Sequence, residues 1–291
     1  MPERITLFLF LAIVLSACGT DNAQTSKTNH TPIPEVLPST EPITLTAANV
    51  SLTIDPGYGA RITSYQYKGR ELLQTKRDSA GITFGSTVWT SPQADWGWPP
   101  PAAFETEPYE AVKLRDNVYV FTSGLDEESG LQIEKRVQLM ANGELGLRYK
   151  VKNEIGMSTQ VAAWEVTRLP YAGYIEFVVS DTVYTDKGDL GVEFRDDRGY
   201  IYFDDQTTEA RKIYATLRDT AVRYHHDGLV FTKQTMITGR NQTVPGQMPL
   251  EVYLDPVRGF AEFELQGGAY NLETGQEATM RVKWLVREEE E

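Results

Sequence analysis

Side chains that commonly bind metals or form disulfides are scarce in this sequence. The 291 residues include one cysteine and three histidines. No paired-cysteine, His-x-His or His-Glu-x-x-His spacing occurs among them. The chain also lacks a glycine-rich phosphate loop and a convincing nucleophile elbow. We therefore predict no metal site and no cofactor.

Positive charge is also in short supply. Lys and Arg number 28 against 41 for Asp and Glu, which gives a formal net charge of -13 and a pI near 4.8. Nucleic acids and anionic lipid surfaces favour proteins with clustered cations. The balance argues against nucleic acid as a partner, and it favours a neutral or cationic ligand over a phosphate-rich one.

The apolar run near the N-terminus is too short to span a bilayer as a helix. Arg4 precedes Ile5–Leu15, a length typical of the apolar part of a signal peptide. Leu15-Ser16-Ala17-Cys18 then resembles a bacterial lipobox. We predict that residues 1–17 are a lipoprotein signal peptide and that lipidated Cys18 anchors the protein to a membrane of the cell envelope, at the outer membrane or its periplasmic face. An ordinary secretory signal followed by a spare thiol is the alternative.

The remaining chain divides into a polar segment and a long alternating one. Residues 18–42 are rich in Thr, Ser, Asn and Pro, which predicts a disordered tether. Apolar and polar residues alternate in 131–139 and again in 145–151, and Asn142-Gly143 between them favours a hairpin turn. We predict that residues 43–291 form one all-β domain, a large antiparallel sandwich with strands numbering roughly in the mid-teens.

Short motifs occur near both ends of this predicted domain. Near its start lie Gly59-Ala60-Arg61-Ile62 and Gly69-Arg70-Glu71-Leu72-Leu73, and near its end lie Glu264-Leu265-Gln266 and Leu272-Glu273-Thr274-Gly275-Gln276. These motifs resemble those of the aldose epimerases, in the galactose mutarotase-like superfamily. The middle of the domain, with Trp89–Gln93 and Trp96–Pro100, is more similar to an uncharacterised bacterial lipoprotein family of that superfamily.

The resemblance implies a super-sandwich with a sugar-binding cleft on one concave sheet, and hence a carbohydrate ligand. It also implies that Glu264 matches the general base that epimerases use on the anomeric hydroxyl. The histidine that protonates the ring oxygen in epimerases has no counterpart, since Val161–Arg168 contains none. Because a base without its acid cannot open the ring by the usual concerted route, the sequence leaves open whether the protein is an enzyme.

An acidic strand face is the first candidate for contacting a sugar. Glu262, Glu264 and Gln266 share one face of a predicted strand, because strand side chains alternate at period two. If this face lines a cleft, the two carboxylates are close enough to share a charge or a metal, and the pKa of one of them would rise. The alternative is a solvated strand face without a ligand.

Three tryptophans form the second candidate. Trp89, Trp96 and Trp98 fall in a segment that is interrupted by prolines and so cannot be a central strand. Indole rings offer the flat apolar surface that stacks on the C–H face of a pyranose. The alternative is that the three rings close one end of the sandwich.

Three further residues are candidate ligand-binding positions. Arg168 could bind a carboxylate or a pair of hydroxyls, and Glu165 lies on the opposite face of the same predicted strand. Ion pairs within the protein explain both residues equally well. His225 could replace the missing acid, although a surface position near the turn at Asp227-Gly228 is the alternative.

These observations support three hypotheses. The first is an exported lipoprotein that binds carbohydrate in a galactose mutarotase-like cleft. The second is a carbohydrate-active enzyme, an epimerase or lyase relative that uses Glu264 with a different acid. The third is a structural lipoprotein of the cell envelope without a ligand. A single open cleft that brings together Glu264, Arg168 and a tryptophan would favour the first two hypotheses.

Overall fold

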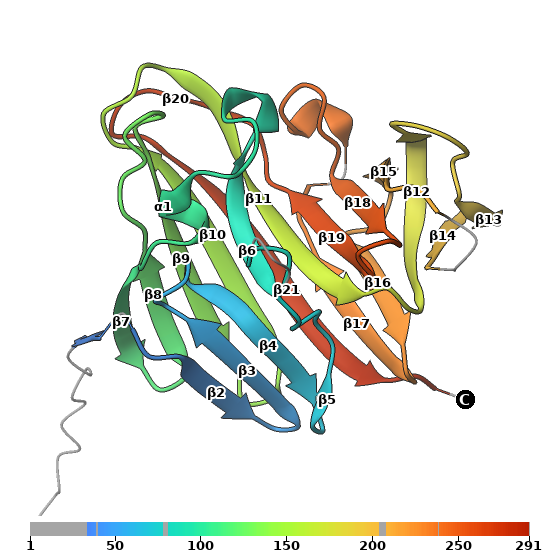
Figure 1. Ribbon diagram of the computed structural model, residues 1–291, viewed down its shortest axis with the longest axis horizontal. Helices are drawn as coiled ribbons and strands as arrows, with labels where there is room; N and C mark the ends of the chain where they lie inside the picture. The colour runs from blue at the N-terminus through green and yellow to red at the C-terminus, as the bar shows by residue number, and fades with distance from the viewer. Residues whose placement is uncertain (1–33, 39, 78–80, 204–207, 238, 291) are drawn as a thin grey trace, which may run out of the picture. The chain divides into compact units, whose positions relative to one another are not determined.

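Strands follow one another along almost the whole of the described chain. The computed structural model describes residues 34–38, 40–77, 81–203, 208–237 and 239–290 (Figure 1). The predicted signal peptide, Cys18 and the tether up to residue 33 lie outside the described residues. Ile33–Glu291 is one compact unit. The predicted antiparallel all-β class is confirmed, because neighbouring strands pair in antiparallel fashion throughout this unit.

Two large sheets make up the domain. The front sheet carries, in spatial order, β2 (Ile43–Ala47), β3 (Val50–Asp55), β4 (Arg61–Tyr67), β6 (Ser86–Ser91), β11 (Thr159–Pro170), β19 (Phe260–Gln266), β18 (Leu250–Asp255) and β15 (Arg211–Leu217). The back sheet carries β1 (Glu35–Leu37), β7 (Glu110–Arg115), β8 (Val118–Thr122), β9 (Leu131–Leu139), β10 (Leu145–Asn153), β21 (Glu277–Glu288), β17 (Leu229–Gln234) and β16 (Ala221–His226).

One long strand belongs to both sheets. The first half of β12 (Tyr174–Thr185) pairs with β16 and with β14 (Arg198–Tyr202), which in turn pairs with β13 (Glu193–Arg195). Its second half pairs with β15 of the front sheet, after an irregularity between Val179 and Val183. The two sheets are therefore continuous at this side of the sandwich.

Shorter elements complete the domain. They are β5 (Arg70–Glu71), which pairs with β4, β20 (Tyr270–Leu272), which pairs with β11, the 3-10 helices η1 (Gln93–Asp95) and η2 (Arg240–Gln242), and the helix α1 (Ala102–Glu105). In Figure 1 the segment after β6 first continues above the upper end of that strand, through η1, and then descends to α1 at the left of the view. No helix within the described residues is long and apolar enough to cross a bilayer.

The hydrophobic core lies between the two sheets. Trp284 of β21 contacts Tyr65 of β4, with ring centres 5.2 Å apart, and Phe231 of β17 lies 6.2 Å from Phe263 of β19. Residues of β9 and β10 alternate strictly between buried and half-buried, as the sequence predicts. The hairpin turn between them is also confirmed, and Gly143 adopts φ +86°, a value that glycine accepts without strain.

Two sequence-based expectations need correction. The predicted tether, residues 18–42, includes β1, which extends the edge of the back sheet by pairing with β7. Polar sequence does not prevent this, because an edge strand is held by backbone hydrogen bonds and Val36 remains 70% exposed. The described chain also forms 21 strands rather than a number in the mid-teens, because several strands have only two or three residues.

Candidate functional site

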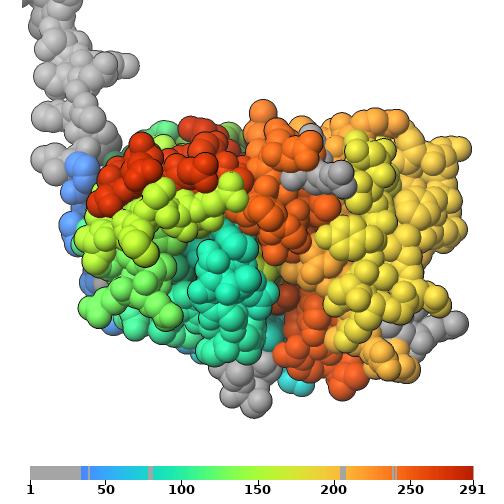
Figure 2. All heavy atoms as spheres, turned by 90° about the horizontal axis from the view of Figure 1, so that it is seen from above, coloured from blue at the N-terminus to red at the C-terminus, as the bar shows by residue number. Residues whose placement is uncertain are grey.

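A cleft of about 370 Å³ opens on the outer face of the front sheet. Figure 2 shows the recess between the cyan residues that follow β6 and the orange residues of β18 and β19. Its lining combines aromatic, cationic and acidic side chains: Thr83, Trp89, Gln93, Trp98, Trp164, Asp186, Lys212, Tyr214, Tyr253, Arg258, Phe260 and Glu262. Such a mixture of aromatic surface and a few polar groups is typical of small-molecule sites.

Lys212 of β15 pairs with two carboxylates at the floor of this cleft. Its Nζ lies 2.6 Å from Glu251 Oε2 and 2.8 Å from Glu264 Oε2. Trp164 donates its indole N–H to the same Glu264 oxygen at 2.8 Å. Both carboxylates are fully buried, whereas the Lys212 side chain keeps 14% of its surface exposed. Glu264 therefore lies beneath Lys212 and Trp164, and it does not belong to the cleft surface.

One cation against two buried carboxylates leaves a proton on one of them. Burial raises the pKa of Glu264 to about 8; the Lys212 ammonium opposes this rise, and Glu262 and Glu251 add to it. Burial alone would lower the pKa of Lys212, but the two carboxylates outweigh it and hold that pKa above its usual value. Lys212 therefore stays charged at neutral pH, and Glu264 is largely protonated there.

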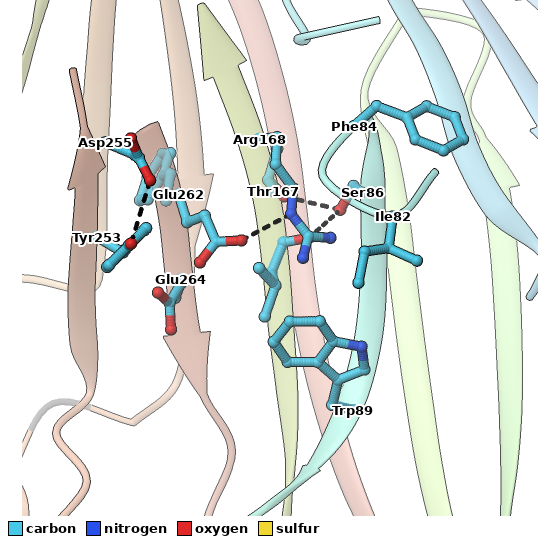
Figure 3. Close-up of polar contacts among 12 residues, drawn as sticks. Ile82, Phe84, Ser86, Trp89, Thr167, Arg168, Tyr253, Asp255, Glu262 and Glu264 are labelled. Atoms are coloured by element: carbon cyan, nitrogen blue, oxygen red, sulfur yellow. Dashed lines mark hydrogen bonds and ion pairs between the residues drawn. The ribbon is translucent and has the colours of Figure 1, made fainter. Parts of the chain in front are cut away.

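Arg168 of β11 positions a third carboxylate, that of Glu262. Its Nε donates to Glu262 Oε1 at 2.8 Å, and its guanidinium carbon lies 4.9 Å from the centre of the Trp89 ring. Figure 3 shows the guanidinium above Trp89 and beside Glu262. The Arg168 side chain is fully buried, whereas Glu262 keeps 12% exposure and lines the cleft. Arg168 thus orients Glu262 and does not itself reach the open cleft.

The three predicted tryptophans gather with Trp164 in one aromatic cluster. The prediction that their segment cannot be a central strand is wrong for Trp89, which lies on β6 between β4 and β11, because the prolines begin only at Pro92, after that strand ends. Trp89 lies edge-on to Trp96, Trp98 and Trp164, at ring-centre distances of 5.7, 6.1 and 5.2 Å. Trp89 is buried and donates its N–H to Glu105 at 2.7 Å, and half-buried Trp96 donates to the Thr90 carbonyl. Trp98 is 57% exposed and lines the cleft. Trp98 is therefore the ring of the three with an open face for a ligand.

The other predicted positions lie away from the cleft. Gln266 is fully buried and accepts a hydrogen bond from the Ser91 hydroxyl at 2.8 Å. Glu165 faces the core between the sheets, because it is adjacent to Trp164 on β11, and it pairs there with Lys233. His225 lies on β16 of the back sheet, with Nδ1 2.8 Å from Glu289 Oε1. The structure therefore brings neither Glu165 nor His225 to the site.

Several cleft residues escape sequence reasoning. Lys212 and Tyr214 of β15 and Tyr253 of β18 reach the cleft because the strand register sets Lys212 opposite Tyr253, and Tyr253 opposite Glu262. The sequence does offer one signal for these residues. Along β15 and β18, polar or aromatic residues alternate with apolar core residues, which predicts that they share the outer face of each strand. That signal does not show which strands become neighbours.

The described residues do not assemble a metal site. No group of three or more His, Cys, Asp or Glu side chains among them is arranged to hold a metal ion. The two histidines within the described ranges, His225 and His226, both lie on β16. The part of the front sheet around Glu264 therefore offers no imidazole, as the stretch Val161–Arg168 predicts.

Comparison with solved structures identifies the architecture. The chain is similar to a galactose mutarotase-like protein from Lactobacillus casei, with 13% identity and a TM-score of 0.58, over 85% of this chain and 100% of that one. A galactose mutarotase-like protein from Clostridium acetobutylicum gives 9% identity and a TM-score of 0.59 over 88% and 98% of the two chains. An aldose epimerase homologue from C. elegans gives 9% identity and a TM-score of 0.57 over 86% and 99%.

Sequence comparison adds no closer relative. No family model matches the chain, and no curated protein matches it. The similarity of its middle segment to an uncharacterised bacterial lipoprotein family thus stays a prediction. At identities this low the shared property is the fold, which the motifs at the two ends of the domain also predict. The chain has the galactose mutarotase-like fold.

Proposed function

We propose that this domain binds carbohydrate in the cleft of the front sheet and does not catalyse ring opening. The observation that carries the proposal is Trp98, a residue that is 57% exposed and lines a cleft of about 370 Å³. A large exposed indole costs free energy in water unless a ligand covers it, and a pyranose offers a matching apolar face. Glu262 and Tyr253 supply polar groups beside it.

The chemistry of the site favours binding over catalysis. A general base for the anomeric hydroxyl must be ionised and must reach the sugar. Glu264 is fully buried, and burial raises its pKa to about 8. The phenols of the cleft are poor acids, since burial raises the pKa of Tyr214 to about 12. Lys212 is no acid for this reaction either, because two carboxylates hold its pKa above its usual value.

The enzyme remains the second candidate, because a buried carboxyl group with a raised pKa beside a cleft is a common feature of catalytic sites. We expect the protein not to accelerate the interconversion of the α and β anomers of glucose or galactose at pH 7 above the spontaneous rate. Polarimetry measures this directly. If the protein interconverts the anomers rapidly and Glu264→Gln abolishes this activity, then Glu264 acts as a general base. The carbohydrate-active enzyme would then replace the binding protein as the first hypothesis.

Sugar binding itself is tested at Trp98. A glycan array identifies a ligand, and calorimetry then compares the wild type with Trp98→Ala, for which we expect roughly tenfold weaker binding through loss of the stacking surface. Phe194→Ala is the matched control, since Phe194 is 49% exposed on β13, away from the cleft. Unchanged affinity in Trp98→Ala would reject the stacking site. The absence of any glycan ligand would favour the third hypothesis, a structural lipoprotein.

Export and anchoring form the other part of the proposal. The lipobox-like segment Leu15-Ser16-Ala17-Cys18 supports a lipid-anchored protein of the cell envelope, at the outer membrane or its periplasmic face. We expect Cys18→Ser to abolish acylation and to release the protein from the membrane fraction. Membrane fractionation and acyl labelling check both effects. Retention of the unlabelled variant in the membrane fraction would contradict the anchor.

A further inference from the structure

Three arginines stand side by side on the outer face of the back sheet, on the opposite side of the sandwich from the cleft. Arg148 of β10 lies directly opposite Arg136 of β9 and Arg281 of β21 in the strand register. Arg136 and Arg148 are half-buried, and Arg281 is exposed. Like charges at opposed positions of neighbouring strands repel one another. This row therefore costs stability unless an anion lies against it.

A second row of hydrogen-bond donors runs beside the arginines. Gln138, Gly146, Lys283 and Gln234 are opposed in register on β9, β10, β21 and β17. Gly146 has no side chain, and around it lies a hollow of about 500 Å³ whose lining includes the three arginines, Lys283 and both glutamines. Among the described residues that line this hollow, none carries a carboxylate.

Neighbouring carboxylates neutralise only part of this charge. Glu134 lies 3.0 Å from a terminal nitrogen of Arg148, and Glu144 lies 2.8 Å from Lys283 Nζ. Within the part of the chain that the structure describes, Arg136 and Arg281 form no ion pair. Two guanidinium groups thus remain without a counter-charge in a protein whose net charge is -13.

We propose that this hollow is a binding site for a small phosphate-bearing ligand. Guanidinium groups present planar pairs of donors that match the oxygens of a phosphate, and the double negative charge of a phosphate monoester balances the two unpaired cations. Strands lie about 4.8 Å apart, so the backbones of the outer two arginines, Arg136 and Arg281, lie roughly 10 Å apart. Their side chains are long enough for both guanidinium groups to contact one phosphate group between them.

Two other occupants fit less well. The acidic C-terminal segment is held elsewhere, because Glu288 pairs with Lys68 and Glu289 with His225. An anionic bilayer is a flat surface that would meet the strongly negative remainder of the protein, whereas the hollow accepts a compact group. The site thus suits a discrete phosphate compound.

Calorimetric titration of the full chain with inorganic phosphate and with glycerol 3-phosphate, at ionic strength held constant with chloride, tests the proposal. We expect saturable binding that weakens on the order of tenfold in Arg136→Ala and in Arg281→Ala. Gly146→Val should abolish binding by filling the hollow without changing charge; its added Cβ meets Met140 at 3.5 Å, an ordinary contact. Arg115→Ala, which removes an exposed arginine of β7, is the matched control and should bind normally.

Thermal unfolding separates a ligand site from a structural role. Because the arginines repel one another, Arg281→Ala should have an unchanged or higher Tm in chloride alone. It should lose the saturable increase in Tm that phosphate produces in the wild type. The general stabilisation by concentrated phosphate is not saturable and should persist in every variant. No saturable binding of either phosphate compound, equal weakening in Arg115→Ala, or binding only to phosphatidylglycerol vesicles would each overturn the proposal.

Discussion

Replacing Lys212 with methionine is expected to lower the free energy of unfolding by about 3–5 kcal/mol at pH 8.5, roughly the cost of leaving buried charge without its partner. Lys212 is the cation between Glu251 and Glu264, and both carboxylates are fully buried. Methionine keeps most of the apolar stem of the lysine, so the loss of unfolding free energy reports the removal of the ammonium group. Urea denaturation at two pH values measures it, with Lys76→Met, at an exposed lysine, as the control.

The pH dependence of this loss follows from Glu264. Burial raises its pKa in the folded protein to about 8, above its usual value of 4.5. Its contribution to stability is therefore fully present below pH 4.5 and is lost as the pH rises through 8. Without Lys212 the carboxyl group of Glu264 holds its proton more strongly. The loss of unfolding free energy in Lys212→Met should therefore be smaller near pH 5 than at pH 8.5. A loss that is larger at pH 5 than at pH 8.5 would contradict this account.

Replacing Lys233 with methionine is expected to cost a similar amount, about 3–5 kcal/mol. Lys233 Nζ lies 2.8 Å from Glu165 Oε2, and neither side chain has any exposed surface. Tyr149 and Trp284 donate to the other oxygen of Glu165, at 2.8 and 3.1 Å. Removal of the lysine leaves a carboxylate in the core between the sheets, out of contact with bulk solvent.

The double variant Lys233→Met with Glu165→Gln provides the control for this pair. Glutamine keeps an oxygen for Tyr149 and Trp284 but carries no charge, so the double variant should recover a large part of the lost stability. Chemical denaturation of both single variants and the double variant completes the cycle. A double variant as unstable as Lys233→Met would show that the charge on Glu165 is not the cause.

Local sequence patterns predicted the hairpin of β9 and β10 and the faces of several strands correctly. The period-two alternation in β9 and β10 marks their buried faces, and Asn142-Gly143 marks the turn between them, because both signals depend only on near neighbours in the chain. The same rule set Glu262 and Glu264 on one face of β19 and Glu165 opposite Arg168 on β11. It did not reveal which of these faces would be covered.

Exposure depends on strands that are distant in the sequence. Trp89 and Trp98 were equivalent candidates, yet Trp89 is buried under Arg168 and bonded to Glu105, whereas Trp98 stays open. Glu264 was expected to face the ligand, yet Lys212 and Trp164 cover it. Net charge also depends on no spatial arrangement. A total of -13 does not show that three arginines lie in one row across β9, β10 and β21.

The sequence by itself determined the all-β class, the hairpin between β9 and β10, the resemblance that the fold bears out and the absence of a histidine from the segment that became β11. Only the tertiary structure decided that Lys212 meets Glu251 and Glu264, that Trp98 is the open tryptophan and that three arginines stand in one row. The physical reason is that strand formation follows short-range alternation, whereas burial, ion pairing and pKa depend on which strands become neighbours in the sheets.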